Sequence, residues 1–169
     1  MLVNLNNIFT RDETEKKLEA DFDFSAWDIS CDAAFTQPVN SVLKLKKGDN
    51  GIFLKLAVHA NATCCCARCL DSFQREFSFT REFVITPDNL TEMECEIPVD
   101  SQSVLDTQQL VRQELALEVD PILLCSEDCE GLCPVCGRPK REGCGCQVPQ
   151  WLDPRLAALR ELLSEEDNE

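Results

Sequence analysis

The residues of this chain whose type and spacing could do chemistry are its cysteines. The chain has 12 of them, and six lie within residues 125–146. A packed core does not need this density, because a buried free cysteine behaves only as a small hydrophobic side chain. Cysteine thiolates at short, regular spacings are the ligands of structural zinc sites. We therefore interpret this segment as a metal-binding module.

The centre of the module is a C-P-x-C-G sequence at residues 133–137, and a C-G-C sequence follows at residues 144–146. Two thiolates separated by two residues can reach one tetrahedral ion. Gly137 then lets the chain turn away, often with a positive φ, and Gly145 lets it fold tightly between two ligands. These two pairs are predicted to form one structural zinc site with the ligands Cys133, Cys136, Cys144 and Cys146.

A second site is predicted from the cysteines that remain. Cys125 and Cys129 form one pair, and Cys66 and Cys69 form another pair far upstream. Neither pair completes a tetrahedral set alone, whereas together they do. Such a site would join distant parts of the chain, and the free energy of metal binding would become folding free energy. Arg68 would offset part of the formal charge of about −2 on zinc with four thiolates.

The cysteine spacing leaves alternatives open for the ligands. Cys129 could replace Cys144 in the first site, and Cys64 or Cys65 could compete with Cys66 in the second. The chain would then bind one zinc ion or two. A redox C-x-x-C pair is also an alternative, but that chemistry expects a helix to begin directly after a strand. The flanks of these pairs have the patterns of strands and loops.

Composition limits the partners that the protein can bind. The net charge of −15, from 31 acidic and 16 basic residues, argues against a large phosphate-binding surface, because nucleic-acid binders usually carry a basic patch. A basic protein partner is favoured by the same charge. Two groups of basic residues are the nearest nucleic-acid candidates, although each is interpreted as a solvated turn: Lys44, Lys46 and Lys47, and Arg138, Lys140 and Arg141.

The sequence predicts a soluble, cytoplasmic protein. Its N-terminus has no basic leader and no sustained apolar run. No segment approaches the roughly 20 apolar residues that span a bilayer. In a reducing cytosol, cysteines bind metal more readily than they form disulfides.

Catalysis is not expected. The single histidine, His59, falls on the polar face of a predicted strand, so no Ser/His/Asp or Cys/His triad can be located. A zinc ion held by four cysteines has no open coordination position, and therefore holds structure without activating water.

The elements that must position these cysteines are mostly strands. Alternating apolar and polar residues predict strands over 27–35, 39–46, 52–63 and 73–85, with a hairpin turn at 47–51. The last two strands are expected to pair antiparallel, which places the cysteines of residues 64–69 in their connection. The first 25 residues show only a possible edge strand at 21–24, and 94–99 suggests another short strand.

A change to helical spacing follows. Asp106 has the pattern of an N-cap with Gln109 three residues on. Leu110, Val111, Leu115 and Leu117 then recur as the apolar positions of one helix, which Asp120-Pro121 ends. A final short helix is predicted to begin at Asp153.

The fold class that follows is α+β. An antiparallel, meander-like sheet, curved or partly closed into a barrel, precedes a helix, a cysteine-rich zinc knuckle and a C-terminal helix. The predicted divisions are a β-rich core with its helix at 1–120, the knuckle packed on this core at 121–150, and the last helix with an acidic tail at 151–169.

The chain resembles the YceD family, bacterial and plastid proteins named for the accumulation of large-subunit ribosomal RNA. The residues that carry the resemblance are Cys66-Ala67-Arg68-Cys69-Leu70, Glu114-Leu115-Ala116-Leu117 before Pro121, Leu124-Cys125, the run 129–137, Cys144-Gly145-Cys146 and the run 153–157. Two features depart from the family pattern. Asp120 stands where an apolar residue is expected, and Cys64 and Cys65 extend the first cysteine pair.

The resemblance implies a cytoplasmic protein that is needed for normal levels of large-subunit ribosomal RNA and has no enzyme activity. The leading hypothesis is a ribosome-biogenesis factor whose acidic surface binds a ribosomal protein or a pre-ribosomal particle. An alternative has Arg138, Lys140 and Arg141 touch ribosomal RNA directly. A third hypothesis is a thiol redox or metal-handling protein.

Overall fold

The computed structural model describes residues 1–10, 15–27, 33–49, 51–86, 97–100 and 102–147. The chain divides into two compact units, Met1–Cys129 and Glu130–Glu169, and the division predicted at residues 120 and 150 stays a prediction. The predicted helix from Asp153, the first half of the predicted strand at 94–99 and most of that at 27–35 lie outside the described residues. No helix in the described ranges is long and apolar enough to cross a membrane.

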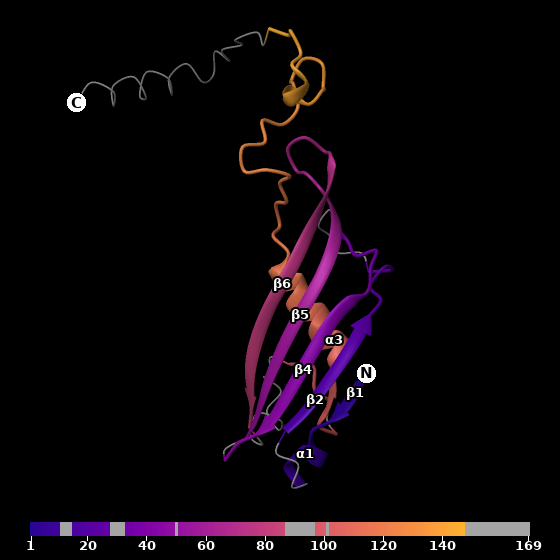
Figure 1. The fold of residues 1–169 in the computed structure, drawn as a ribbon, viewed down its shortest axis with the longest axis vertical. Helices are drawn as coiled ribbons and strands as arrows, with labels where there is room; N and C mark the ends of the chain where they lie inside the picture. Colours follow the sequence, from indigo (N-terminus) through magenta and orange to yellow (C-terminus); the bar gives the residue numbers. More distant parts are fainter. Residues whose placement is uncertain (11–14, 28–32, 50, 87–96, 101, 148–169) are drawn as a thin grey trace, which may run out of the picture. The chain divides into compact units, whose positions relative to one another are not determined.

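The first unit is built on a five-stranded antiparallel sheet. Its strands are β2 (Glu15–Phe22), β3 (Ala33–Ala34), β4 (Val39–Lys47), β5 (Ile52–Cys65) and β6 (Ser72–Ile85). β4 pairs with β2 on one side and β5 on the other. β6 pairs with the far side of β5, and β3 pairs with the end of β5 beyond β4. Figure 1 shows the long strands side by side.

The expectation of a partly closed barrel is wrong. Among the described residues, β2 pairs only with β4 and β6 only with β5, so the sheet stays open. An open sheet must bury its apolar face against other elements. Here the helix α3 (Thr107–Glu118) and residues of the N-terminus join the same core as the sheet, and Figure 1 shows α3 across one face. The sheet therefore has no need to close on itself.

The hairpin of β5 and β6 confirms the predicted antiparallel pair. The register runs from Ile52 opposite Ile85 to Cys65 opposite Ser72. Alternate residues of β5 are buried from one end to the other, because one face of the sheet packs on the core and the other faces solvent. The hairpin leaves residues 66–71 as its connection, which holds the first pair of predicted ligands.

A two-stranded sheet formed by the N-terminus was not predicted. β1 (Leu2–Asn4) pairs antiparallel with β7 (Val104–Asp106), and the helix α1 (Asn6–Thr10) follows β1. Val3, Leu5 and Ile8 lie in the core. β2 begins at Glu15, well before the predicted edge strand at 21–24. β1 was missed because its three residues are too few to show a period. The start of β2 was missed because its first residues are charged and exposed.

Helix α3 begins and ends as predicted. The carboxylate of Asp106 accepts from the backbone N–H groups of Gln108 at 3.0 Å and Gln109 at 3.3 Å. Leu110, Val111 and Leu115 are buried. Leu117, predicted on the same apolar face, is 76% exposed. It lies in the last turn, where no described side chain buries it.

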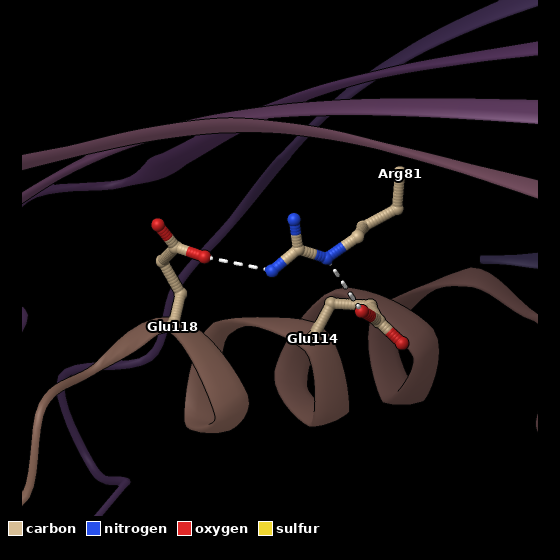
Figure 2. Close-up of polar contacts among 3 residues, drawn as sticks. All are labelled: Arg81, Glu114 and Glu118. Atoms are coloured by element: carbon tan, nitrogen blue, oxygen red, sulfur yellow. Dashed lines mark hydrogen bonds and ion pairs between the residues drawn. The ribbon is translucent and has the colours of Figure 1, made fainter.

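Arginines on the inward face of β6 bind the end of α3. Arg81 donates from Nη2 to Glu118 Oε2 at 2.8 Å and lies 3.5 Å from Glu114 through Nε, as Figure 2 shows. Nη2 of Arg75 makes a 2.8 Å ion pair with Oδ2 of Asp120. Asp120, which stands where the family pattern has an apolar residue, therefore has an ion-pair partner on the sheet.

We expect Arg81→Ala to lower the free energy of unfolding by about 1–3 kcal/mol, because the nearly buried Glu114 loses its guanidinium neighbour. The matched control is Lys55→Ala, which breaks the 2.7 Å pair with Glu82 on the exposed face of the sheet. That pair contributes less than about 0.5 kcal/mol. Urea denaturation followed by circular dichroism compares the variants, and equal losses would contradict the role given to Arg81.

Candidate metal centres

The described residues contain two clusters of four cysteines. The hairpin tetrad is Cys66, Cys69, Cys125 and Cys129, and the knuckle tetrad is Cys133, Cys136, Cys144 and Cys146. In each tetrad the four sulfur atoms lie within 4.8 Å of one another. The structure thus brings together both predicted sets of ligands, each inside a single compact unit.

The sulfur separations fit a tetrahedral ion. In the hairpin tetrad, the Sγ atoms of Cys66 and Cys129 are 3.8 Å apart, and those of Cys69 and Cys125 are 3.7 Å apart. Zinc–sulfur bonds of about 2.3 Å at tetrahedral angles place neighbouring sulfurs about 3.8 Å apart. The donor set and its spacing are therefore compatible with zinc.

Backbone hydrogen bonds position the hairpin tetrad. In the connection of β5 and β6, the N–H of Leu70 donates to the carbonyl of Cys66 at 2.9 Å, which closes a tight turn. The N–H of Ala67 donates to the carbonyl of Leu123 at 2.8 Å. Leu123 is buried in the core, so this bond fixes the segment that leads to Cys125 against the hairpin.

Arg68 holds the two halves of the hairpin tetrad together. Its Nη1 donates to the carbonyl oxygens of Glu127 at 3.2 Å and Cys129 at 3.0 Å. The sequence analysis gave this guanidinium only a charge-balancing role. The structure adds a geometric one, because the side chain between two ligands of one half binds the backbone beside a ligand of the other half.

The structure places Cys66 in the tetrad, and neither of the two cysteines before it. Cys64 is buried on the inward face of β5, and its burial raises the pKa of its thiol. The Sγ of Cys65 lies 3.4 Å from the carbonyl oxygen of Leu70. Cys129 groups with Cys66 and not with the knuckle cysteines.

The knuckle tetrad is positioned within the second unit by a similar turn. The N–H of Gly137 donates to the carbonyl of Cys133 at 2.8 Å, and the N–H of Cys133 donates to the carbonyl of Arg138 at 2.7 Å. Gly137 has a φ of 71°, as its place after the second cysteine predicted. Gly145 has no left-handed φ, and a Cβ there would meet nothing within 4 Å, so this position does not depend on glycine.

The two turns differ in one residue that sequence reasoning missed. Leu70 occupies the place after Cys69 that Gly137 occupies after Cys136, and its φ is 61°. A left-handed conformation costs an ordinary residue about 1–2 kcal/mol. The signal that could have found this turn is the C-x-x-C spacing itself, since it places Leu70 where the other pair has glycine.

Backbone dipoles favour one thiolate in the hairpin tetrad. Burial opposes ionisation of Cys66, but N–H groups of Cys125, Cys69 and Arg68 outweigh it and lower the pKa of this thiol to about 6. Cys66 is therefore largely a thiolate at neutral pH, the form that binds a cation.

The knuckle tetrad has the same asymmetry. N–H groups of Cys136 and Val135 lower the pKa of Cys133 to about 6. The hydrogen bond with Cys133 raises the pKa of Cys144, and the thiol of Cys136 raises the pKa of Cys146 to about 12. The thiol of Cys133 ionises readily, while Cys144 and Cys146 keep their protons unless a cation balances their charge.

His59 belongs to neither tetrad. It lies on the exposed face of β5, and its Nδ1 is 3.4 Å from Oε1 of Glu76. Each tetrad is a set of four sulfurs, and an ion held by four cysteines keeps no position for a substrate. The geometry suits a structural ion.

The comparison with known families covers both tetrads. A family model described as the large ribosomal RNA subunit accumulation protein YceD matches residues 54–163. The chain belongs to the YceD family. The match includes β5, β6 and α3, the elements that position the hairpin tetrad, and confirms the resemblance drawn from the cysteine motifs.

Relatives of this YceD-family chain occur in mycobacteria. Uncharacterized proteins of Mycobacterium bovis and of Mycobacterium tuberculosis are 30% identical to it over 130 residues, which make up 75% of this chain. The chain spans 62% of the length of these relatives. No solved structure matches the chain.

We expect Gly137→Ala to weaken retention of added zinc about fivefold, because a left-handed φ costs alanine about 1 kcal/mol or more. Gly145→Ala is the matched control, since its backbone needs no left-handed φ, and is expected to change retention less than about twofold. Competition with a colorimetric chelator measures both. Equal weakening would show that the turn does not depend on Gly137.

Proposed function

We propose that this YceD-family protein is a non-enzymatic, zinc-binding factor of ribosome biogenesis. It acts in the cytoplasm and supports accumulation of large-subunit ribosomal RNA through contacts with proteins. The observation that carries the proposal is the presence of two four-sulfur clusters in a chain that the model of a ribosomal RNA accumulation family matches.

Zinc in this proposal stabilises structure. The hairpin tetrad joins the connection of β5 and β6 to the segment after α3, and the knuckle tetrad joins residues 133–136 to 144–146. Each set of four sulfurs thus joins two separate segments of its unit. The free energy of zinc binding would therefore contribute directly to folding of these loops.

The charge of the chain supports a basic protein partner. The excess of 31 acidic over 16 basic residues gives a net charge of −15, and ribosomal proteins are a basic class of partner. Complementary charges speed association, and salt weakens them. A ribosomal protein or a pre-ribosomal particle is the partner that this surface suits.

Direct contact with ribosomal RNA through the knuckle is a second candidate. Arg138, Lys140 and Arg141 are all exposed in the second unit, and the short 3-10 helix η1 (Lys140–Glu142) carries two of them. Thiol redox chemistry is a third candidate, favoured only by the lowered pKa values of Cys66 and Cys133. Rapid alkylation of these thiols in zinc-loaded protein would support it.

We expect purified protein to contain two zinc ions per chain. Cys66→Ser and Cys133→Ser should each reduce the content to one, because each removes a ligand from a different tetrad. Cys65→Ser is the control, since Cys65 lies beside the hairpin tetrad and outside it. Mass spectrometric metal analysis measures the content, and an unchanged value of two in either ligand variant would refute the assignment of that tetrad.

We also expect the zinc-loaded protein to sediment with large-subunit precursors and to dissociate as salt is raised, because opposite charges attract it. Small-subunit precursors are the control for specificity. Sedimentation through sucrose, followed by immunoblotting, measures the association. A protein that stays at the top of the gradient at every salt concentration would contradict the proposed partner.

A further inference from the structure

The outward face of the five-stranded sheet carries a concentration of lysines. Burial alternates along β4 and β5, so every second side chain points away from the core. The chain has seven lysines, and six of them lie in three neighbouring strands, β2, β4 and β5: Lys16, Lys17, Lys44, Lys46, Lys47 and Lys55. Lys16 and Lys47 stand opposite the buried Leu45 and Ile52, so four of the six lie on the outward face. In a chain of net charge −15, the central strands β4 and β5 carry lysines and no carboxylate.

Strand register puts like charges directly opposite one another. Lys44 pairs with Lys17 on β2 and with Lys55 on β5, which makes a row across three strands. Like charges that face each other across strands destabilise a sheet. We name Lys17, Lys44, Lys46 and Lys55 the lysine patch. A polyanion bound to it would relieve this repulsion.

The patch keeps free cations at its centre. Lys17 pairs with Glu19, and Lys55 pairs with Glu82 at 2.7 Å, toward the two sides of the sheet. Within the described ranges, no ion pair involves Lys44 or Lys46. Glu15 stands opposite Lys46 in the register, so the carboxylates beside the patch lie on the flanking strands β2 and β6. Among the described strands, the unpaired positive charge is therefore confined to the central strands.

An exposed aromatic ring lies beside these lysines. Phe53 stands opposite Lys46 in the strand register and is 51% exposed. A Cβ on Gly48 would lie 2.4 Å from Cε2 of Phe53, so the ring packs directly on the glycine backbone. This contact holds the half-buried ring on the outward face of the sheet. A fixed, accessible ring is a platform on which a base can stack.

We propose that the lysine patch and Phe53 bind single-stranded RNA. The lysines would neutralise phosphates, and the ring would stack on a base, the two contacts by which proteins hold single strands. This surface contains none of the tetrad cysteines and none of the basic residues of the knuckle. It adds an RNA contact to a protein whose proposed function rests on protein partners.

The test measures binding of a fluorescent uridine oligonucleotide to zinc-loaded, full-length protein by anisotropy over a range of salt. We expect the variant Lys44→Gln/Lys46→Gln/Lys55→Gln to reduce the magnitude of the salt slope by about two, since single strands release about 0.7 counterions per neutralised phosphate. Phe53→Ala should weaken binding about tenfold with an unchanged slope, because stacking involves no counterions.

The variant Arg138→Gln/Lys140→Gln/Arg141→Gln removes the same number of charges from the knuckle, which is the second candidate for RNA contact, and so compares the two sites directly. A site on the lysine patch predicts that the patch variant loses more affinity than the knuckle variant. Equal zinc content and circular dichroism verify that each variant folds. The proposal is overturned if the wild type does not bind, or if only the knuckle variant loses binding. It is also overturned if duplex RNA binds equally well and Phe53→Ala does not weaken that binding, or if an acidic peptide binds better than RNA.

Discussion

Repulsion between closely packed sulfurs is the constraint on which both units depend. Two thiolates about 4 Å apart repel by about 4 kcal/mol in the effective dielectric near a protein surface, so four within 4.8 Å cannot all ionise without a cation. Lowered pKa values at Cys66 and Cys133 show that each loop prepares one thiolate. Four sulfurs this close carry their full charge only when a cation is present. An arrangement that is costly alone would become favourable with the proposed zinc ion bound.

Contacts between the β5–β6 hairpin and the segment from the end of α3 onward position the second half of the hairpin tetrad, Cys125 and Cys129. Arg81 binds Glu118 at the end of α3, and Arg75 binds Asp120 two residues later. The chain then reaches the hairpin connection, where Ala67 binds Leu123. As the chain leaves α3, its partners run backwards along the hairpin, from Arg81 to Arg75 to Ala67. Each contact therefore brings the next into reach, and Cys125 arrives beside Cys69. Asp120, which looked like a departure from the family pattern, belongs to this series.

Sequence reasoning succeeded where a pattern was long and failed where it was short. The 14 residues of β5 and of β6 show an unbroken alternation, and antiparallel pairing then puts Cys66 and Cys69 in the connection. The partners of these ligands followed from counting the cysteines left over. The pairing of β1 with β7 could not be predicted, because each has three residues and they lie about one hundred positions apart. Closure of the sheet was wrongly expected because alternation alone does not say what covers the apolar face.

Each tetrad and the inward face of the sheet lie within a single unit, which leaves the exposed charges to bind other molecules. The acidic excess and the lysine patch differ in sign, and a patch of one sign on a protein of the other repels most of the partners that the rest of its surface attracts. If both proposals hold, a basic protein and an RNA strand would bind different parts of the chain without competing. Particles that contain both kinds of molecule are the setting in which this separation of charge is useful. The repulsion between Lys17, Lys44 and Lys55 would then be a cost in folding that is recovered only on binding.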